Sequence, residues 1–496
     1  MVVAQSVRAS DCGSEGRGFE THQPPFSKTL VMKSKYVVYK KTLLASLLVI
    51  FFLPLLQGSF KLLPKAELHG AFAEPRDTTF TLSGWFSGTY QQNKETYLSQ
   101  SFGLRSLFIR THNEIALDLF HKVYAKGVII GKENYLYEEN YIKAYYGIDF
   151  IGKDSISNRM KKLKFIQDTL ASLNKTFLLV FAAGKGSFYP DHFPDKYQYI
   201  KGITNYEYSL EKAKELSINY IDFNKYFIEN KNRSAYPLYP KYGIHWSYYA
   251  ECLVADSITR YIENIRHIHM PHIYWNKVNV RYPQRYERDM DVEDGLNLIF
   301  RFKKEKMAYP DILFQTDSGK TKPTSIVIAD SYYWGMHRFN FPSVFSNSSF
   351  WFYNQTAYNG KEFKFYPSTF FKCFNTWVHL LVTYPERYKS PLEVPSLNLK
   401  EQVDSSDVII IMATEPSLAN LGWGSIENMY TMFKGIKPDK KLDSLYLQKL
   451  NTIKNYIKSD KNWLSQIETG AKKEGISLDS AITANAKWVI EHEKGK

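Results

Sequence analysis

The chain has 496 residues, of which 44% are hydrophobic, 23% charged and 16% aromatic, and this composition excludes an intrinsically disordered protein. Its formal net charge of +14 suits an anionic polymer or lipid surface, but no long Lys/Arg block and no helix-turn-helix, zinc-finger or RNA-binding signature points to nucleic acid. The three cysteines, Cys12, Cys252 and Cys373, fit no Cys/His ligand spacing, so we expect neither a disulfide framework nor a structural metal.

The first 31 residues have neither helical nor strand periodicity. Residues 3–25 resemble the conceptual translation of a transfer-RNA gene. We therefore interpret residues 1–31 as an extension that arises from a start codon placed too early, and we expect the protein to begin at Met32.

We interpret residues 32–60 as a signal anchor, and a buried core helix of a cytoplasmic protein is the other interpretation of such an apolar run. Four lysines precede the apolar run TLLASLLVIFFLPLL at residues 42–56. Lysines before such a run keep the N-terminus in the cytoplasm, so we expect a single-pass protein of the cytoplasmic membrane with its bulk on the periplasmic or extracytoplasmic side. The alternative is cleavage at Ala71-Phe72-Ala73, about 17 residues beyond the run and farther than signal peptidase sites usually lie.

A tether at 61–95 precedes the main domain at 96–435, where strand and helix patterns alternate. Residues 97–124 have helical spacing, residues 128–137 look like a short hairpin, and Ser247 caps a helix that runs to about residue 265. Apolar strands are predicted at residues 176–183, 219–223, 325–330, 349–354 and 407–412. The alternation predicts an α/β fold with a mostly parallel sheet and helices on both faces. Residues 266–324 are interpreted as an irregular insertion, and residues 436–496 as a basic helical tail.

One candidate reactive loop follows the strand that ends at Asp330. Its sequence, IVIADSYYWGM, puts the Ser331 hydroxyl at the carboxyl edge of the sheet, where ligand chemistry gathers in such folds. Backbone N–H groups near Ser331 and Tyr332, at the start of the next helix, would stabilise an oxyanion, and Asn354, at the end of its own strand, would add a donor. Asp and Ser are also ordinary helix caps, which is the alternative interpretation.

Two further loops offer reactive side chains. In YPKYGIHWSYYAE, His245 lies just before a capped helix, where a neutral imidazole would accept the proton of a nucleophilic serine. In FAAGKGSFYPDHFPD, Lys185 would bind a carboxylate or phosphate, although a simple turn explains the loop as well. The spacing is not that of a P-loop.

Together these loops resemble a known family. The segments GKENYLYE, GKGSFYPDHFP, GIHWSYYA and IADSYYWGM are similar in order and spacing to the SGNH-hydrolase-like domain of alginate-type polysaccharide O-acetyltransferases, over roughly residues 80–430. The resemblance implies a permuted strand order, with Ser331 as nucleophile and His245 as base. It also implies a polysaccharide substrate and a multi-pass membrane acyltransferase as partner, and no cofactor is expected.

One position departs from the family pattern. The acid that stands two residues before the histidine in the family falls on Gly243, which has no carboxylate. Candidates to orient the imidazole instead are Asp222, at the end of its strand, Glu415 in ATEPSLANLGWG, or a backbone carbonyl. Loss of an orienting carboxylate costs around 10⁴-fold in rate when nothing replaces it.

The sequence therefore predicts transfer of acetyl groups onto a carbohydrate polymer, with Trp246, Tyr332 and Trp334 as part of a sugar-stacking wall. Two alternatives stay open. One is an acetyl-esterase that uses the same residues. The other is a catalytically silent carbohydrate-binding or scaffold protein of an export complex, which the missing acid at Gly243 favours.

Overall fold

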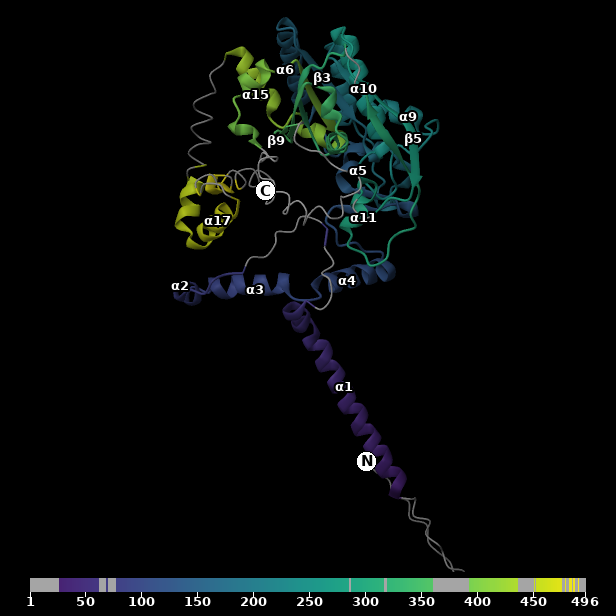
Figure 1. Cartoon of the computed structure of the whole chain (residues 1–496), viewed down its shortest axis with the longest axis vertical. Coiled ribbons are helices and arrows are strands. Elements are labelled where there is room, and N and C mark those ends of the chain that lie inside the picture. The colour runs from purple at the N-terminus through teal and green to yellow at the C-terminus, as the bar shows by residue number, and fades with distance from the viewer. Residues whose placement is uncertain are drawn as a thin grey trace, which may run out of the picture. The chain divides into compact units, whose positions relative to one another are not determined.

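The computed structural model describes residues 26–61, 68–69, 77–284, 287–315, 319–359, 392–435 and, with short gaps, 450–489 (Figure 1). It divides into two compact units. The first comprises Met1–Ala66 and Glu74–Leu107, and the second comprises Glu67–Ala73 and Phe108–Lys496.

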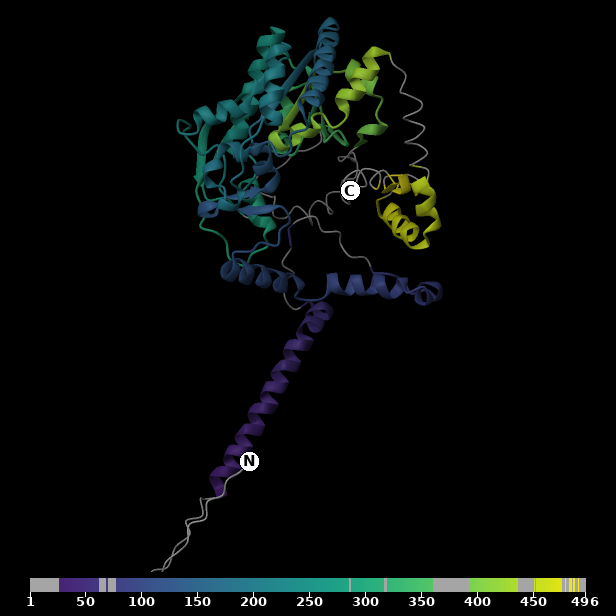
Figure 2. The same cartoon turned by 180° about the vertical axis from the view of Figure 1, so that it is seen from behind.

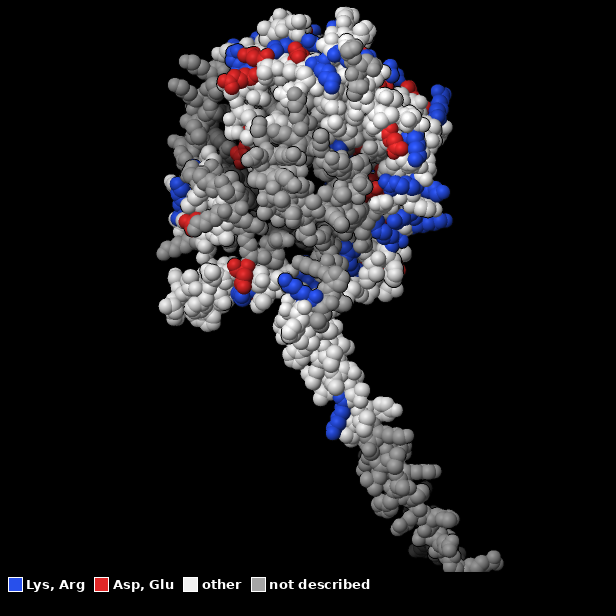
Figure 3. Space-filling view, in the orientation of Figure 1, with Lys and Arg blue, Asp and Glu red and all other residues white. Residues whose placement is uncertain are grey.

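The first unit is helical where it is described. It contains α1 (Phe26–Phe60), α2 (Leu82–Phe86), α3 (Thr89–Ser101) and the start of α4 (Arg105–Phe120). Within α1, Tyr36–Phe60 is long and apolar enough to cross a membrane, with a mean hydropathy of 2.1 and no part of it buried. Figure 3 shows mostly uncharged side chains along its described length. Helix α1 begins at Phe26, before the expected start at Met32. The segment 61–95, predicted to be a tether, contains α2 and part of α3.

The second unit is built on a seven-stranded sheet of order β10-β9-β8-β7-β11-β3-β4. Its strands are β3 (Thr176–Ala182), β4 (Tyr220–Asp222), β7 (Thr324–Ala329), β8 (Asn347–Phe352), β9 (Thr356–Asn359), β10 (Leu392–Glu393) and β11 (Val408–Thr414). Strands β8, β7, β11, β3 and β4 are mutually parallel, and β9 and β10 add an antiparallel edge. This arrangement brings the carboxyl ends of β7, β11 and β3 to one edge.

Helices cover both faces of the sheet, as predicted. Alternate residues of β3 enter two separate cores, because successive side chains of a strand point to opposite faces. Leu178 and Val180 pack with Val254 and Ile258 of α10. On the other face, Phe177, Leu179 and Phe181 pack with the apolar stripe of α6 and with α15. Figures 1 and 2 show β3 between α6 and α10.

The described helices of the second unit follow the predicted strand-helix alternation. They are α5 (Glu139–Tyr146), α6 (Lys153–Ser172), α7 (Lys185–Phe188), α8 (Asn205–Glu215), α9 (Phe223–Asn230), α10 (Tyr248–Arg266), α11 (Asp291–Gly295), α12 (Tyr333–Arg338), α14 (Leu399–Asp404), α15 (Ser425–Lys434) and α17 (Lys461–Glu474). The predicted hairpin forms from β1 (Val128–Ile130) and β2 (Leu136–Glu138), and Ser247 caps α10 as predicted. The tail is helical in α17, while residues 436–449 lie outside the described residues.

The segment 266–324, predicted to be irregular, is more ordered than expected. It contains an antiparallel pair, β5 (Ile273–Arg281) and β6 (Met307–Phe314), and between them the short helix α11. A register shift between Trp275 and Val278 breaks the alternation of β5, and 25 residues separate the two strands in sequence. These two features hide the hairpin from a search for local periodicity.

Candidate active site

Two loops from different parts of the chain meet at the carboxyl edge of the sheet. Ser331 follows β7 and precedes α12, and His245 lies just before α10. The Ser331 Oγ is 2.8 Å from Nε2 of His245, a hydrogen-bonding distance. Both residues are half-buried, so the pair is within reach of solvent. This is the geometry in which an imidazole accepts the proton of a hydroxyl nucleophile.

The second ring nitrogen of His245 faces a carboxylate that the sequence analysis did not single out. Nδ1 forms a short hydrogen bond with Oδ2 of Asp291, the first residue of α11. The other oxygen of Asp291 accepts a 2.9 Å hydrogen bond from the N–H of Ile244. The carboxylate is thus fixed on both oxygens, and it holds the imidazole with Nε2 toward Ser331.

Charges around His245 act on its basicity in opposite directions. Burial and the positive charge of Arg288 lower the pKa of His245, and Asp291 opposes them. Burial raises the pKa of Asp291, but His245, the Ile244 N–H and Arg288 outweigh burial and hold this pKa below its ordinary value. The arrangement favours an ionised aspartate beside a neutral imidazole, which is the state a general base requires.

Gly243 explains why the acid stands elsewhere. A Cβ at this position would lie 2.5 Å from the carbonyl oxygen of Arg288 and 3.0 Å from the carbonyl carbon of Asp289. The backbone that leads into Asp291 therefore occupies the space that a side chain at 243 would need. A glycine at this position and an aspartate at 291 are two parts of one arrangement.

Asp330 and Tyr332 hold the two loops together rather than facing the reactive atoms. Oδ2 of the buried Asp330 accepts from the N–H and the hydroxyl of Thr414, at 2.8 and 2.7 Å, which ties the Ser331 loop to the end of β11. Oδ1 accepts from the N–H of Tyr332 at 3.1 Å, so this N–H, expected at the oxyanion, is already engaged. The Tyr332 hydroxyl donates to the Ile244 carbonyl at 2.6 Å.

Tyr353 is a neighbour of Ser331 that sequence reasoning missed. Burial raises the pKa of Tyr353 to about 12, against an opposing effect of the Ser331 side chain and backbone, so its hydroxyl stays neutral. Its φ of 48° places it in a tight turn after β8, a conformation that no sequence pattern in SFWFYN announces. The adjacent Asn354, expected as an oxyanion donor, gives its amide to the carbonyl of Trp423 at 3.1 Å.

The two carboxylates proposed from the sequence to orient His245 have other partners. Asp222 accepts from the Tyr206 hydroxyl at 2.9 Å and caps α9 through the Lys225 N–H. Glu415 accepts hydrogen bonds from Ser187 and Asn224, each at 2.5 Å. Its carboxylate packs against Gly184, where a Cβ would lie 2.1 Å from Oε2. The structure gives the contact with the imidazole to Asp291 instead.

Three of the four side chains expected to bind substrate, Lys185, Trp246 and Tyr332, are enclosed in the protein. Lys185 is fully buried, and its amine donates to the carbonyls of Lys241 and Gly243 at 2.8 and 2.6 Å, so it supports the His245 loop. Burial lowers the pKa of Lys185 to about 7. Trp246 is fully buried against Tyr332. Trp334 is half-buried and packs edge-on against Phe350 and Tyr358.

Arg288 connects the nucleophile loop with a buried carboxylate. Its guanidinium donates to the backbone carbonyl of Ser331 at 3.2 Å and pairs with Glu251 at 3.1 Å. Gly335 leaves room for this carboxylate, because a Cβ there would lie 1.7 Å from the Glu251 Oε1. Arg288 is thus held where its charge acts on His245.

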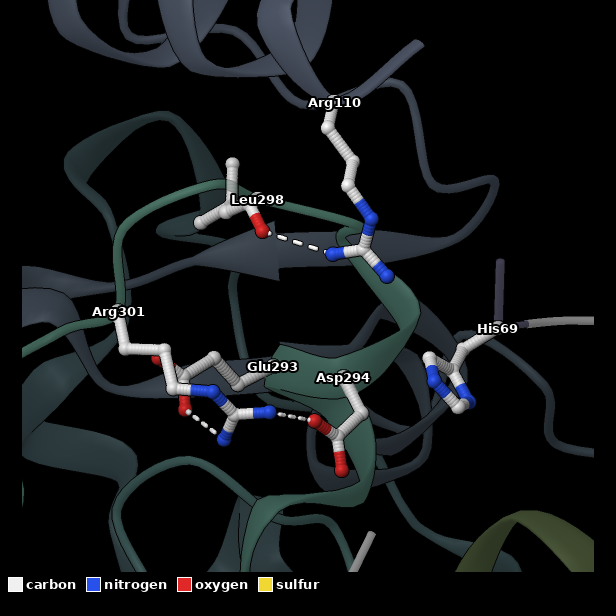
Figure 4. A pocket seen from close by; sticks show the side chains of 6 residues that line it. All are labelled: His69, Arg110, Glu293, Asp294, Leu298 and Arg301. Atoms are coloured by element: carbon white, nitrogen blue, oxygen red, sulfur yellow. Dashed lines mark hydrogen bonds and ion pairs between the residues drawn. The ribbon is translucent and has the colours of Figure 1, made fainter. Parts of the chain in front are cut away.

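The far end of α11 is fixed by a second set of ionic contacts, around a small pocket lined by His69, Arg110, Glu293, Asp294, Leu298 and Arg301 (Figure 4). Arg301 pairs with Glu293 at 3.5 Å and with Asp294. The pocket does not include the reactive pair, and the ion pairs in its lining tie Arg301 to the helix that carries Asp291. Among the described residues, no group of three or more His, Cys, Asp or Glu side chains is arranged to hold a metal ion.

Comparisons with solved structures find distant similarities. The O-acetyltransferase domain of Pseudomonas putida AlgJ is 12% identical, with 62% of this chain and 99% of that chain covered at a TM-score of 0.38. AlgX of Pseudomonas aeruginosa is 9% identical, with 61% and 67% covered at a TM-score of 0.35. PatB1 of Bacillus cereus is 11% identical, with 60% and 98% covered at a TM-score of 0.35. No curated protein matches the chain.

A family comparison matches part of the second unit. Residues 128–273 fit the family described as "SGNH hydrolase-like domain, acetyltransferase AlgX". The matched segment includes Lys185, Gly243 and His245, while Asp291 and Ser331 lie beyond it. The match confirms, for residues 128–273, the resemblance to the SGNH-hydrolase-like domain of this acetyltransferase family that the loop motifs indicated.

Proposed function

We propose that the protein is an O-acetyltransferase that moves acetyl groups onto an exported or cell-surface polysaccharide through an acyl-enzyme on Ser331. The observation that carries the proposal is the chain of contacts from Asp291 through His245 to Ser331, with 2.8 Å between Oγ and Nε2. The similarity of residues 128–273 to an acetyltransferase domain supports the type of acyl group.

In the first half-reaction, the Ser331 oxygen attacks the carbonyl carbon of an acetyl donor while Nε2 of His245 takes the hydroxyl proton. The tetrahedral intermediate collapses as the imidazolium returns this proton to the leaving group, which departs and leaves an acetyl ester on Ser331. Asp291 stabilises the imidazolium without accepting its proton.

In the second half-reaction, a hydroxyl of the glycan attacks the acetyl ester. His245 accepts the proton of this hydroxyl and then returns a proton to the Ser331 oxygen, so the free enzyme is restored and the glycan carries the acetyl group. We assign the Ser331 N–H and the neutral Tyr353 hydroxyl to the oxyanion in both steps, because the pKa of Tyr353 responds to the Ser331 side chain and backbone.

The location follows from the anchor. With Lys40 and Lys41 at the cytoplasmic end of α1, the second unit lies on the periplasmic or extracytoplasmic side of the cytoplasmic membrane, where an exported polymer passes. Acetyl donors made in the cytoplasm do not reach this side unaided. A multi-pass membrane acyltransferase that carries acetyl groups outward is therefore the partner we propose.

Transfer and hydrolysis share one acyl-enzyme and differ in the acceptor. The test is to incubate the protein with an acetyl ester and an acetyl-free oligosaccharide, and to determine the masses of both the sugar and the released acid. Acetylated sugar that depends on Ser331 and His245 is the expected result. Free acetate alone would identify an acetyl-esterase, and an inert Ser331 in a folded protein would identify a silent binding protein.

A further inference from the structure

Helix α4 buries Ala116 and Leu117 in the core, but it also exposes several large apolar side chains and buries two charged ones, which is unusual for a helix on a water-soluble surface. Phe108, Ile115 and Leu119 are 46%, 50% and 70% exposed, while Arg110 and Glu114 are only 7% and 9% exposed. The exposed residues recur at helical spacing on one face of Arg105–Phe120. The exposed His112 lies on the same face, and the large exposed apolar side chains around it indicate an apolar neighbour.

Hydrogen bonds on the opposite side fix this orientation. Arg110 donates to the Leu298 carbonyl at 2.9 Å, and Asn113 donates to the Leu296 carbonyl at 2.8 Å. Glu114 accepts from the N–H groups of Ile299 and Phe300 at 2.7 and 3.0 Å. Turning the apolar face of α4 inward would break all four contacts and leave charged groups without them, so the exposure is built into the fold.

The start of α4 is fixed to the end of the anchor helix. A Cβ on Gly103 would lie 2.2 Å from the Pro54 carbonyl oxygen and 2.4 Å from the Gly58 nitrogen, so the turn between α3 and α4 packs directly on the last turns of α1. With the lysines of α1 in the cytoplasm, Pro54 and Gly58 lie in the last two turns of the span Tyr36–Phe60, at its outer end. The first residues of α4 are therefore at the level of the outer headgroups.

Within the first unit, α2 and the turn before it also expose large apolar side chains. Phe80, Leu82, Trp85 and Phe86 are all exposed, and Phe86 is 83% exposed. Aromatic side chains concentrate at membrane interfaces because their rings suit the boundary between headgroups and acyl chains. Phe300, whose N–H is held by Glu114, adds an exposed ring beside α4.

We propose that α4 is an interfacial helix that lies in the outer surface of the membrane, with Phe108, Ile115 and Leu119 inserted between lipid headgroups. Insertion of an apolar face to the depth of the acyl boundary is the established mode of such helices. The inference rests on the membrane orientation of α1 and not on acetyl transfer, so the two proposals fail separately.

The experiment uses the full chain in vesicles of phosphatidylethanolamine and phosphatidylglycerol. Cys12 and Cys373 are replaced by Ser and Cys252 by Ala, and single cysteines are introduced as Phe108→Cys or Leu119→Cys. Each carries an environment-sensitive fluorophore, and quenching by a lipid with a nitroxide near its headgroup is measured. Lys161→Cys, on an exposed turn of α6, is the matched water control, and Leu48→Cys, within α1, reports insertion of the anchor.

The expected result is blue-shifted emission and nitroxide quenching at positions 108 and 119, with neither at 161. Emission and quenching at 119 that equal those at 161, in vesicles where position 48 is protected, would overturn the proposal. Protection of 119 only in membranes that contain other proteins would also overturn it, in favour of a protein partner on this face.

Discussion

At His245, a positively charged and a negatively charged neighbour shift the pKa of the imidazole in opposite directions. Arg288 and burial lower the pKa of the imidazole, and Asp291 raises it. A base whose pKa is lowered is neutral over a wider range of pH, which suits an enzyme that must accept a serine proton in neutral surroundings.

The pH profile tests this balance. Below its pKa, His245 is protonated and accepts no proton, so kcat/KM for an acetyl ester falls on the acid side. Arg288→Gln removes a positive charge that lowers this pKa, so the pKa rises and the acid limb moves to higher pH. Arg260→Gln, at an exposed side chain of α10, is the control and leaves the acid side of the profile in place. If the acid side of the profile moves to lower pH in Arg288→Gln, the assignment of His245 as a base whose pKa Arg288 lowers is contradicted.

The identity of the orienting acid gives a second prediction. Asp291→Asn keeps the shape of the side chain but removes the charge that stabilises the imidazolium, so kcat should drop by about 10³–10⁴-fold. The matched control is Asp222→Asn, which alters the cap of α9 and leaves kcat within about 3-fold, because the loss of a cap acts on stability. Steady-state kinetics on both variants decide between the two carboxylates. Equal losses of kcat would contradict the assignment of Asp291 as the acid that orients His245.

At the scale of elements, the site depends on the fit between the His245 loop and the chain entering α11. The Arg288 and Asp289 backbone passes against Gly243, where a Cβ would meet atoms at 2.5 and 3.0 Å. Lys185 supports the same loop from inside through two carbonyls. The position of Asp291 is therefore set by backbone contact rather than by the sequence around His245.

Substitution at Gly243 tests this coupling. Gly243→Ala forces the segment 288–291 away, so we expect kcat to fall and stability to drop by about 1–3 kcal/mol, as for other overpacked sites. Gly295→Ala, at the end of α11 with open space around its Cβ, is the control and should change neither. Kinetics and thermal unfolding measured together check the prediction, and an active, stable Gly243→Ala variant would refute the coupling.

Local sequence predicted some strands of the sheet well, but it did not predict which side chains form the site. Strands such as TFLLVFAA and IVIAD were predicted because strands buried on both faces read as continuous apolar runs. Asp291 was not predicted, because ERDMDVEDG contains five carboxylates and only tertiary packing selects the one that meets His245. Trp246 and Lys185 were expected to face substrate, because a loop sequence does not reveal which side chains fold back into the core.

At the scale of the whole molecule, the anchor decides where any activity takes place. The apolar stretch of α1, Tyr36–Phe60, has the length and hydropathy to span a bilayer. We predict that the full chain stays in the membrane fraction after washing at alkaline pH, whereas a chain that begins at Asp77 does not. Because α4 would still bind lipid weakly, the shortened chain should associate reversibly with vesicles. Full release of the complete chain by the wash would contradict the anchor.

The acyl-enzyme on Ser331 is tested by the mass of the peptide that contains Ser331, after brief exposure of the protein to an activated acetyl ester without a sugar acceptor. We predict one acetyl group on Ser331, its loss when oligosaccharide is added, and its absence in His245→Ala. Acetylation at another residue, or unchanged ester turnover by Ser331→Ala, would contradict this prediction.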